Sequence, residues 1–174
     1  MTVPRWFFAL SLGLTLLIYG IMVFWGSPIL IREAGGLLPF DLRPFGYGAE
    51  EARAYLSALS DEGRVFYRDV IGRLDGVFPP LLALSLILCF LRLSSRRPAA
   101  LLSAVAIAAA VLDLLENAGI ARMLETDVAS VTDAMVAHIS RLTQLKWAAD
   151  GVTLAALAAL LARAVARRLQ NRLQ

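Results

Sequence analysis

Four long stretches of this chain are almost free of charged residues. The first, residues 6–25, contains no charged side chain, and a helix of that length is roughly 30 Å long, the thickness of a bilayer hydrocarbon core. Lipid cannot hydrogen-bond to the backbone, so such stretches cross a membrane as helices. We therefore predict an all-α fold, a four-helix transmembrane bundle that forms a single domain over residues 1–174. The predicted helices span about 6–25, 77–93, 99–120 and 142–165, with an outer loop at 26–76.

The distribution of arginine predicts the orientation of the bundle. The side that would carry both termini and the short turn 94–98 has eight arginines and no acid, whereas the opposite side has eight arginines and eleven acids. Loops rich in positive charge stay in the cytoplasm during insertion. We therefore expect a multi-pass protein of the bacterial inner (cytoplasmic) membrane, with both termini in the cytoplasm.

The predicted outer loop has two halves of different character. Proline and glycine punctuate the first half and indicate turns. The second half predicts two short helices, 49–59 and 61–74, with Ser60 as the cap of the second. The loop also carries four aromatic residues that we expect to be exposed. They are Phe40, Phe45, Tyr47 and Tyr55.

Polar residues interrupt the third and fourth predicted helices near their outer ends. On each helix three of them are spaced three and four residues apart, which places them on one face. They are Asp113, Glu116 and Asn117 on the third helix and Thr143, Lys146 and Asp150 on the fourth. The two helices are antiparallel because an outer loop joins them. We therefore expect Lys146 to lie level with Glu116 and Asn117, and Asp150 level with Asp113.

Ionisable groups at this depth are costly, at about 2.5–3.5 kcal/mol each near the membrane centre and less towards its edge. They must face the bundle interior and find partners there. Three carboxyl groups and one ammonium group do not balance, so we expect at least one carboxyl group to carry a proton near neutral pH. An alternative is that this cluster only holds two helices together, for which polar contacts contribute about 0.6 kcal/mol on average.

The candidate site follows from this pattern. Ionisable residues inside a membrane commonly mark functional sites, and a carboxyl group beside a lysine can act as an acid or a base. The candidate catalytic residues are Asp113, Glu116, Lys146 and Asp150. The candidate binding residues are Asn117, Thr143, Asp75, Tyr67 and Arg64. For Asp75 the alternative is a helix cap at the interface, and for Tyr67 and Arg64 it is a solvated or interfacial position.

Several kinds of site are disfavoured by composition. The only cysteine and the only histidine, Cys89 and His138, allow no disulfide or CxxC pair and make a zinc site improbable. A net charge of +3 without a basic stripe does not indicate nucleic-acid binding. Carboxylates could hold a cation, but Lys146 beside them argues against one. We expect no metal and no cofactor.

Parts of the sequence resemble a group of small four-helix bacterial integral membrane proteins of uncharacterised function. The resemblance is carried by Asp113-Leu-Leu-Glu-Asn117 on the third helix and by Leu142-Thr-x-x-Lys-Trp147 on the fourth. The stretch 41–47, the run 50–52, and Leu74-Asp75 ahead of Phe78-Pro79 are similar as well. The resemblance extends over most of the chain. It implies a fold and a set of positions, not an activity.

Three classes of function are compatible with these features. The first is the binding or modification of a lipid or other amphiphile, with Lys146 holding a phosphate or carboxylate. The second is an accessory or assembly subunit of a larger membrane complex, in which the charged cluster is structural. The third is proton or ion handling, although the cytoplasmic halves of the third and fourth helices carry no acid or histidine to complete a path within one chain. A homo-oligomer could supply the rest of such a path. Membrane lipids are expected partners in all three.

Overall fold

Helices make up almost all of the chain that the computed structural model describes, residues 4–171, and no strand occurs in that range. Four helical stretches are long and apolar enough to cross a membrane. They are Arg5–Glu33, Asp61–Leu93, Arg96–Glu125 and Asp133–Gln170. The prediction of an all-α bundle of four helices with membrane-spanning length is confirmed.

Two of the four stretches are composite. The first consists of α1 (Arg5–Ile21), the π-helical segment η1 (Met22–Gly26) and α2 (Ser27–Glu33). The second consists of α4 (Asp61–Val65), the π-helical segment η3 (Phe66–Ile71) and α5 (Gly72–Leu93). The third is α6 (Arg96–Glu125) and the fourth is α7 (Asp133–Gln170). Short π-helical turns inside α-helices occur frequently at functional sites.

The two π-helical segments pack against each other. Trp25 and Phe66 meet edge to face, with ring centroids 5.2 Å apart. Gly26 lies directly against the side chain of Ile71, which a Cβ atom at position 26 would meet. Glycine at this position therefore allows the close approach of the two segments. The contact holds the two composite stretches together just before α2 and just before α5.

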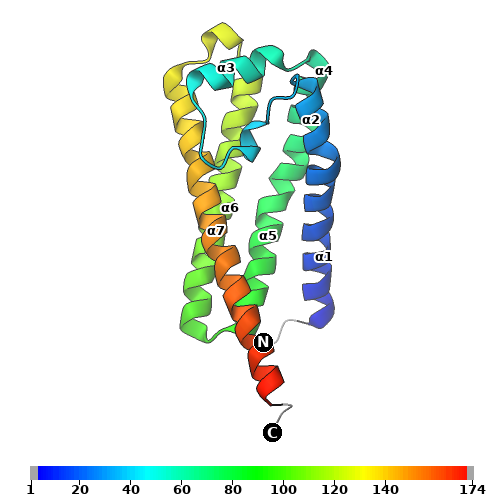
Figure 1. Cartoon of the computed structure of the whole chain (residues 1–174), viewed down its shortest axis with the longest axis vertical. Coiled ribbons are helices and arrows are strands. Elements are labelled where there is room, and N and C mark those ends of the chain that lie inside the picture. Colours follow the sequence, from blue (N-terminus) through cyan, green and yellow to red (C-terminus); the bar gives the residue numbers. More distant parts are fainter. Residues whose placement is uncertain (1–3, 172–174) are drawn as a thin grey trace.

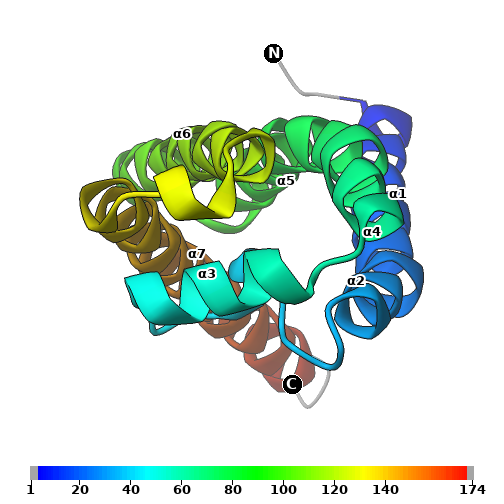
Figure 2. The same cartoon turned by 90° about the horizontal axis from the view of Figure 1, so that it is seen from above.

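The long helices pack in chain order. α1 contacts α5, α5 contacts α6, and α6 contacts α7, which also reaches α5; Figure 2 shows the resulting arc from above. Between α1 and α5, Ser85 Oγ lies 2.7 Å from Ser11 Oγ and 2.9 Å from Thr15 Oγ1. The half of the bundle that holds the turn between α5 and α6 has an apolar core, which includes Leu86 and Phe90.

The outer connection is shorter than predicted. We expected a loop over 26–76, but the first stretch continues to Glu33 and the second begins at Asp61. The predicted helix 49–59 is present as α3 (Ala49–Ala58), whereas the predicted helix 61–74 is the beginning of the second stretch. Ser60 caps it as expected, accepting a hydrogen bond from the Gly63 N–H at 2.9 Å. Hydropathy marks only the part of a helix inside the hydrocarbon, so it misses polar turns that packing keeps helical.

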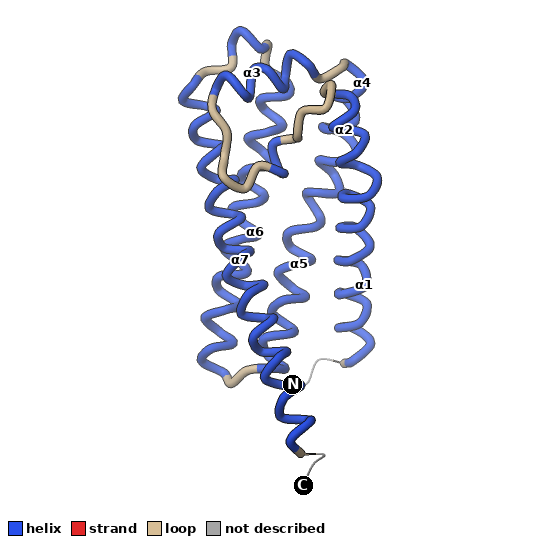
Figure 3. The backbone as a smooth tube through the Cα atoms, in the orientation of Figure 1, coloured by secondary structure: helices blue, strands red, loops and turns tan. Residues whose placement is uncertain are grey.

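Between α2 and α3 the chain turns back into the mouth of the bundle. Figure 3 shows this connection descending from the upper rim in this view and rising again to α3, which crosses the mouth in Figure 1. We call residues 36–48 the re-entrant segment; it contains the short 3-10 helix η2 (Phe40–Leu42). Phe40 is fully buried, with its ring centroid 4.8 Å from that of Tyr47 and 4.9 Å from that of Tyr55.

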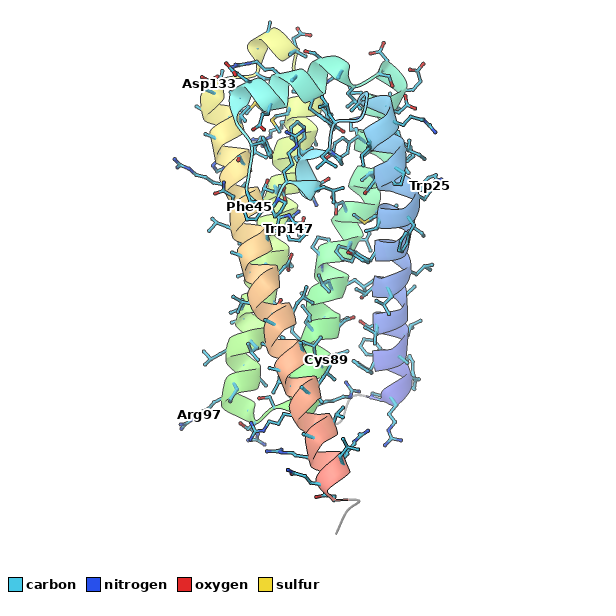
Figure 4. All side chains as sticks on the ribbon, in the orientation of Figure 1. Trp25, Phe45, Cys89, Arg97, Asp133 and Trp147 are labelled. Atoms are coloured by element: carbon cyan, nitrogen blue, oxygen red, sulfur yellow. The ribbon has the colours of Figure 1, made fainter. Side chains whose placement is uncertain are left out.

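This burial corrects the expected exposure of the loop aromatics. Phe40, Tyr47 and Tyr55 are 0%, 7% and 0% exposed, because the re-entrant segment folds inward and packs Phe40 against Tyr47 and against Tyr55 of α3. Phe45 alone of the four is exposed, at 93%. Figure 4 shows Phe45 close to Trp147 and well below Asp133, so the tip of the re-entrant segment reaches down along α7.

The opposite end of the bundle is the basic one. The start of α1, the turn between α5 and α6 and the end of α7 all lie there (Figure 1). Figure 4 shows Arg97 at this end, on the far side of Cys89 from the re-entrant segment. Of the eight arginines expected here, Arg172 lies outside the described residues.

Candidate functional site

The centre of the site is the side chain of Lys146 on α7. Its Nζ lies 2.5 Å from Glu116 Oε2 and 3.3 Å from Asp113 Oδ1, both on α6. All three residues are buried, with exposures of 6%, 0% and 6%. The predicted register is therefore confirmed, since Lys146 lies level with Glu116 and reaches both acids.

Thr143 completes the contact between α6 and α7. It lies one helical turn before Lys146 and is fully buried. Its Oγ1 donates a hydrogen bond of 2.6 Å to Glu116 Oε1. One oxygen of the Glu116 carboxyl group thus faces an ammonium group and the other faces a hydroxyl group. Charge-assisted contacts on both oxygens hold this carboxyl group in one orientation.

Asp75 and Asn117 join α5 to the same site. Asp75 is 6% exposed, and its backbone oxygen accepts a 3.2 Å hydrogen bond from Asn117 Nδ2. The interpretation of Asp75 as an interfacial helix cap is wrong. Its helical stretch begins at Asp61, so position 75 lies inside the helix and faces the bundle.

The re-entrant segment supplies an acid that sequence analysis missed, Asp41. The hydroxyl group of Tyr67 on η3 donates a 2.7 Å hydrogen bond to Asp41 Oδ2, and Trp147 Nε1 donates one of 3.0 Å to the Asp41 carbonyl oxygen. Asp41 is also close enough to Lys146 for electrostatic attraction. Tyr67 is 3% exposed, so the solvated interpretation of this residue is wrong. The only signal for Asp41 was its place in the stretch 41–47, since no periodicity positions a residue in a turn.

Three buried polar atoms next to this cluster have no hydrogen bond of normal geometry within residues 4–171. They are Asp41 Oδ1, the hydroxyl oxygen of Tyr55 and the hydroxyl oxygen of Tyr47, which approaches Thr143. Burial raises the pKa of both tyrosines above the ordinary value, and the nearby Asp41 carboxylate adds to the rise. Both hydroxyl groups therefore remain protonated and able to donate at physiological pH. Buried polar groups almost always have a partner, so this set calls for an explanation.

A small pocket lies beside Asp41. Tyr67, Asp75 and Asn117 line it together with Asp41, and exposed residues of η3 and α5, among them Gly72, form part of its wall. Its volume of about 20 Å³ is room for a single water molecule. The pocket therefore has no room for anything larger.

Two of the predicted residues lie apart from the central cluster. Asp150 is one helical turn beyond Lys146 and lines the interface of α5 and α6 with Asp113, but its carboxyl group makes no hydrogen bond or ion pair in the described part of the chain. Arg64 donates hydrogen bonds of 2.6 Å to the Leu124 carbonyl oxygen and 2.9 Å to that of Leu56. It thus holds the rim of the bundle together.

The ionisable groups of the site are mostly acids. Four carboxyl groups, those of Asp41, Asp75, Asp113 and Glu116, influence one another and the single ammonium group of Lys146. Nowhere in residues 4–171 are three or more His, Cys, Asp or Glu side chains arranged to hold a metal ion. Such a site can attract cations and hydrogen-bond donors and can exchange protons, whereas an added anion meets repulsion.

Fold and site together define a helical bundle with four stretches of membrane-spanning length and a buried acid–lysine cluster at one end, roofed by a re-entrant segment. No protein-family model, curated protein or solved structure matches the chain.

Proposed function

We propose that this chain is an integral protein of the bacterial inner membrane that binds the polar head of an amphiphile in the outer leaflet. The arginine-rich end of the bundle lies in the cytoplasm in this proposal, as the excess of arginine over acid at that end supports. The acid–lysine cluster then lies in the outer half of the membrane, beneath the re-entrant segment.

The observation that carries this proposal is the set of unpartnered polar atoms under the roof of the site. Leaving a buried donor or acceptor without a partner costs about 1–3 kcal/mol. Tyr47 and Tyr55 offer two donors and Asp41 Oδ1 one acceptor, all beside the charged cluster. A ligand head with both donors and acceptors would satisfy the three together.

The charge of the site selects the kind of head. Lys146 already contacts two carboxyl groups, so it has little capacity for a phosphate or a carboxylate. The surrounding acids would repel an anion but attract an ammonium group or accept hydrogen bonds from hydroxyl groups. The proposed ligand is therefore an amphiphile with a hydroxyl-bearing or amine-bearing head, and not one held by Lys146 through a phosphate.

The re-entrant segment provides the route from lipid. Phe45 at its tip is 93% exposed, and Leu37, Leu38 and the neighbouring Trp147 are also exposed. Apolar side chains in these positions suit contact with acyl chains. Because the pocket beside Asp41 holds only a water-sized volume, a head group is admitted when this segment moves outward.

Chemistry at this site would rest on the cluster itself. Glu116 is fixed on both oxygens and Lys146 lies against it, so a proton can pass between a ligand and these groups over hydrogen-bond distances. Asp113 and Asp150 extend the set towards the membrane centre. We propose that the cluster binds the amphiphile and, as an extension, that it modifies the bound head group.

The two other functions receive less support. An accessory subunit was expected to use four exposed aromatics, of which three are buried. Proton transport across the bundle needs a polar path, but the apolar core around Leu86 and Phe90 lies between the site and the basic end.

Lipid analysis of the purified protein tests the proposal. The full chain is extracted in mild detergent, and native mass spectrometry identifies the amphiphiles that remain bound. The variant Y47F/Y55F removes two unpartnered hydroxyl groups, and we expect about tenfold less bound amphiphile, since two hydrogen bonds contribute roughly 1–3 kcal/mol. Y19F is the matched control, because Tyr19 is 51% exposed on α1 and lies outside the site.

Two results would contradict the proposal. One is a wild-type protein without any bound amphiphile. The other is a Y47F/Y55F variant that retains the wild-type lipid profile and is more stable, as removal of truly orphaned polar groups predicts. Recovery of a stoichiometric membrane-protein partner without lipid would favour the accessory subunit instead.

A further inference from the structure

A second cavity lies at the basic end of the bundle, at the opposite end from the acid–lysine cluster. Its volume is about 320 Å³, within the range of small-ligand pockets. Its wall combines the turn between α5 and α6 with the last turns of α7. The lining residues are Leu93, Ser94, Ser95, Pro98, Leu160, Arg163, Ala164 and Arg167.

Two arginines dominate the chemistry of this cavity. Arg163 and Arg167 are four residues apart on α7, so they project from the same face. Neither guanidinium group makes a hydrogen bond or an ion pair with any residue of the described chain, 4–171. Like charges at this spacing repel each other by about 0.2–0.5 kcal/mol. An anion between them would turn that repulsion into two attractive contacts.

The opposite wall supplies hydrogen-bonding groups. Ser94 and Ser95 contribute hydroxyl groups from the turn between α5 and α6. Ser95 is the N-cap residue of α6, and its side chain makes no cap hydrogen bond. Its hydroxyl group is therefore not used by the helix and can bind a ligand oxygen.

The remaining lining is apolar. Leu93, Leu160 and Ala164 lie beside the arginines and serines in the same cavity. Hydrocarbon beside a cationic wall is the composition that anionic lipid head groups meet in basic pockets between membrane helices. A soluble ion would use the arginines and serines but would gain nothing from the leucines.

We propose that this cavity is a binding site for a phosphate group, carried by an anionic lipid of the leaflet at the basic end or by a soluble phosphate. The arginines hold the phosphate oxygens, the serine hydroxyl groups complete the contact, and the leucines face the glycerol and acyl portion. The site is independent of the acid–lysine cluster. The rival explanation is that both arginines only extend to the membrane surface, as basic residues at helix ends do.

Lipid competition tests this assignment. The full chain is placed in nanodiscs with equal parts of phosphatidylglycerol and phosphatidylcholine, and the lipid retained after transfer to detergent is measured by native mass spectrometry. We expect phosphatidylglycerol to be retained by the wild type and reduced about tenfold or more in R163Q/R167Q, since each basic side chain contributes about a factor of five. R97Q/R168Q removes the same charge outside the cavity, and we expect it to retain phosphatidylglycerol within about twofold.

A second variant separates the cavity from its charge. A164L fills part of the volume without changing any charge, and it should also reduce phosphatidylglycerol retention. Addition of inorganic phosphate distinguishes a lipid phosphate from a soluble one. If phosphate does not displace the lipid, the cavity is a lipid site. If phosphate displaces the lipid and the displacement depends on Arg163 and Arg167, the cavity is a site for soluble phosphate. Equal losses in R163Q/R167Q and R97Q/R168Q, or no preference for phosphatidylglycerol in the wild type, would overturn the proposal.

Discussion

The hydroxyl group of Tyr67 donates a 2.7 Å hydrogen bond to Oδ2 of Asp41, which joins the re-entrant segment to the helical stretch that begins at Asp61. Tyr67 is buried, and the second oxygen of Asp41 is buried with no hydrogen-bond partner among residues 4–171. One side chain of a helix thus positions the acid that the re-entrant segment contributes to the site. The stability of the roof should depend on this bond.

Replacement of Tyr67 by phenylalanine tests this dependence. Y67F keeps the ring but leaves Asp41 without its donor, and we expect a loss of about 1.5–3 kcal/mol, as for a hydrogen bond to a charged group. The loss should be local, so hydrogen exchange of the re-entrant segment should accelerate while that of α6 stays unchanged. Y19F is the control, because Tyr19 is exposed on α1 and lies away from Asp41. Unchanged exchange in the re-entrant segment would show that Tyr67 does not hold it.

The ion pair between Glu116 and Lys146 gives a second prediction. The double variant E116Q/K146M removes both charges of this pair, and Asp113, which also contacts Lys146, can then become neutral by taking up a proton. Replacement of a buried pair by neutral groups is often neutral for stability or even favourable. The glutamine can still accept the hydrogen bond from Thr143. We therefore expect thermal stability in detergent within about 1 kcal/mol of the wild type.

The same double variant separates a functional from a structural cluster. We expect E116Q/K146M to fold and yet to lose the bound amphiphile, because binding requires the charges themselves. E116Q alone leaves Lys146 with Asp113, 3.3 Å away, so it should keep part of the binding. A stable double variant with the wild-type lipid profile would end the functional interpretation of this pair.

Gly46 should be the most sensitive position of the re-entrant segment. Its φ of +82° disfavours any other residue, and a Cβ atom would collide with Gln144 Nε2 and lie 2.6 Å from Ser140 Oγ. These two side chains hold the segment on α7, since Gln144 donates to the Phe45 carbonyl oxygen and Ser140 Oγ accepts from the Tyr47 N–H.

We therefore expect G46A to destabilise the protein by about 2–4 kcal/mol, combining backbone strain with overpacking. The matched control is G35A, because Gly35 also has a positive φ, +62°, but open space around it. G35A should lose only the stability that corresponds to backbone strain, about 1–2 kcal/mol. Denaturation of both variants in the same detergent measures the difference in their free energies of unfolding. Equal losses of stability would show that the contact with α7 does not contribute to the effect of G46A.

Orientation in the membrane can be measured directly. In a C89A background, single cysteines at Ser57 and Ser95 report on opposite ends of the bundle, because Ser57 lies on α3 and Ser95 precedes α6. Both residues are exposed. We expect a membrane-impermeant thiol reagent to label S57C but not S95C in intact cells, and both after lysis. The reverse pattern would place the acid–lysine site in the cytoplasmic leaflet.

The sequence by itself determined the helices and the central pair of the site. In lipid, apolar stretches of membrane-spanning length can satisfy their backbone hydrogen bonds by forming helices. The four-helix architecture therefore follows from composition. The spacing of Asp113 and Glu116 places both on one face, and the antiparallel connection brings Lys146 level with them. Helical periodicity is a local property, which is why this part could be predicted from residues close in the sequence.

Only the tertiary structure decided the roof of the site and the ends of the helices. Asp41, Tyr47 and Tyr55 face the cluster because the chain after α2 turns inward, whereas the same aromatics were expected on the outside. Asp75 likewise became a buried site residue once packing extended its helix back to Asp61. The direction of a turn-rich segment depends on contacts with helices far away in the sequence. Those contacts leave no periodic pattern in the sequence, so the sequence could not predict them.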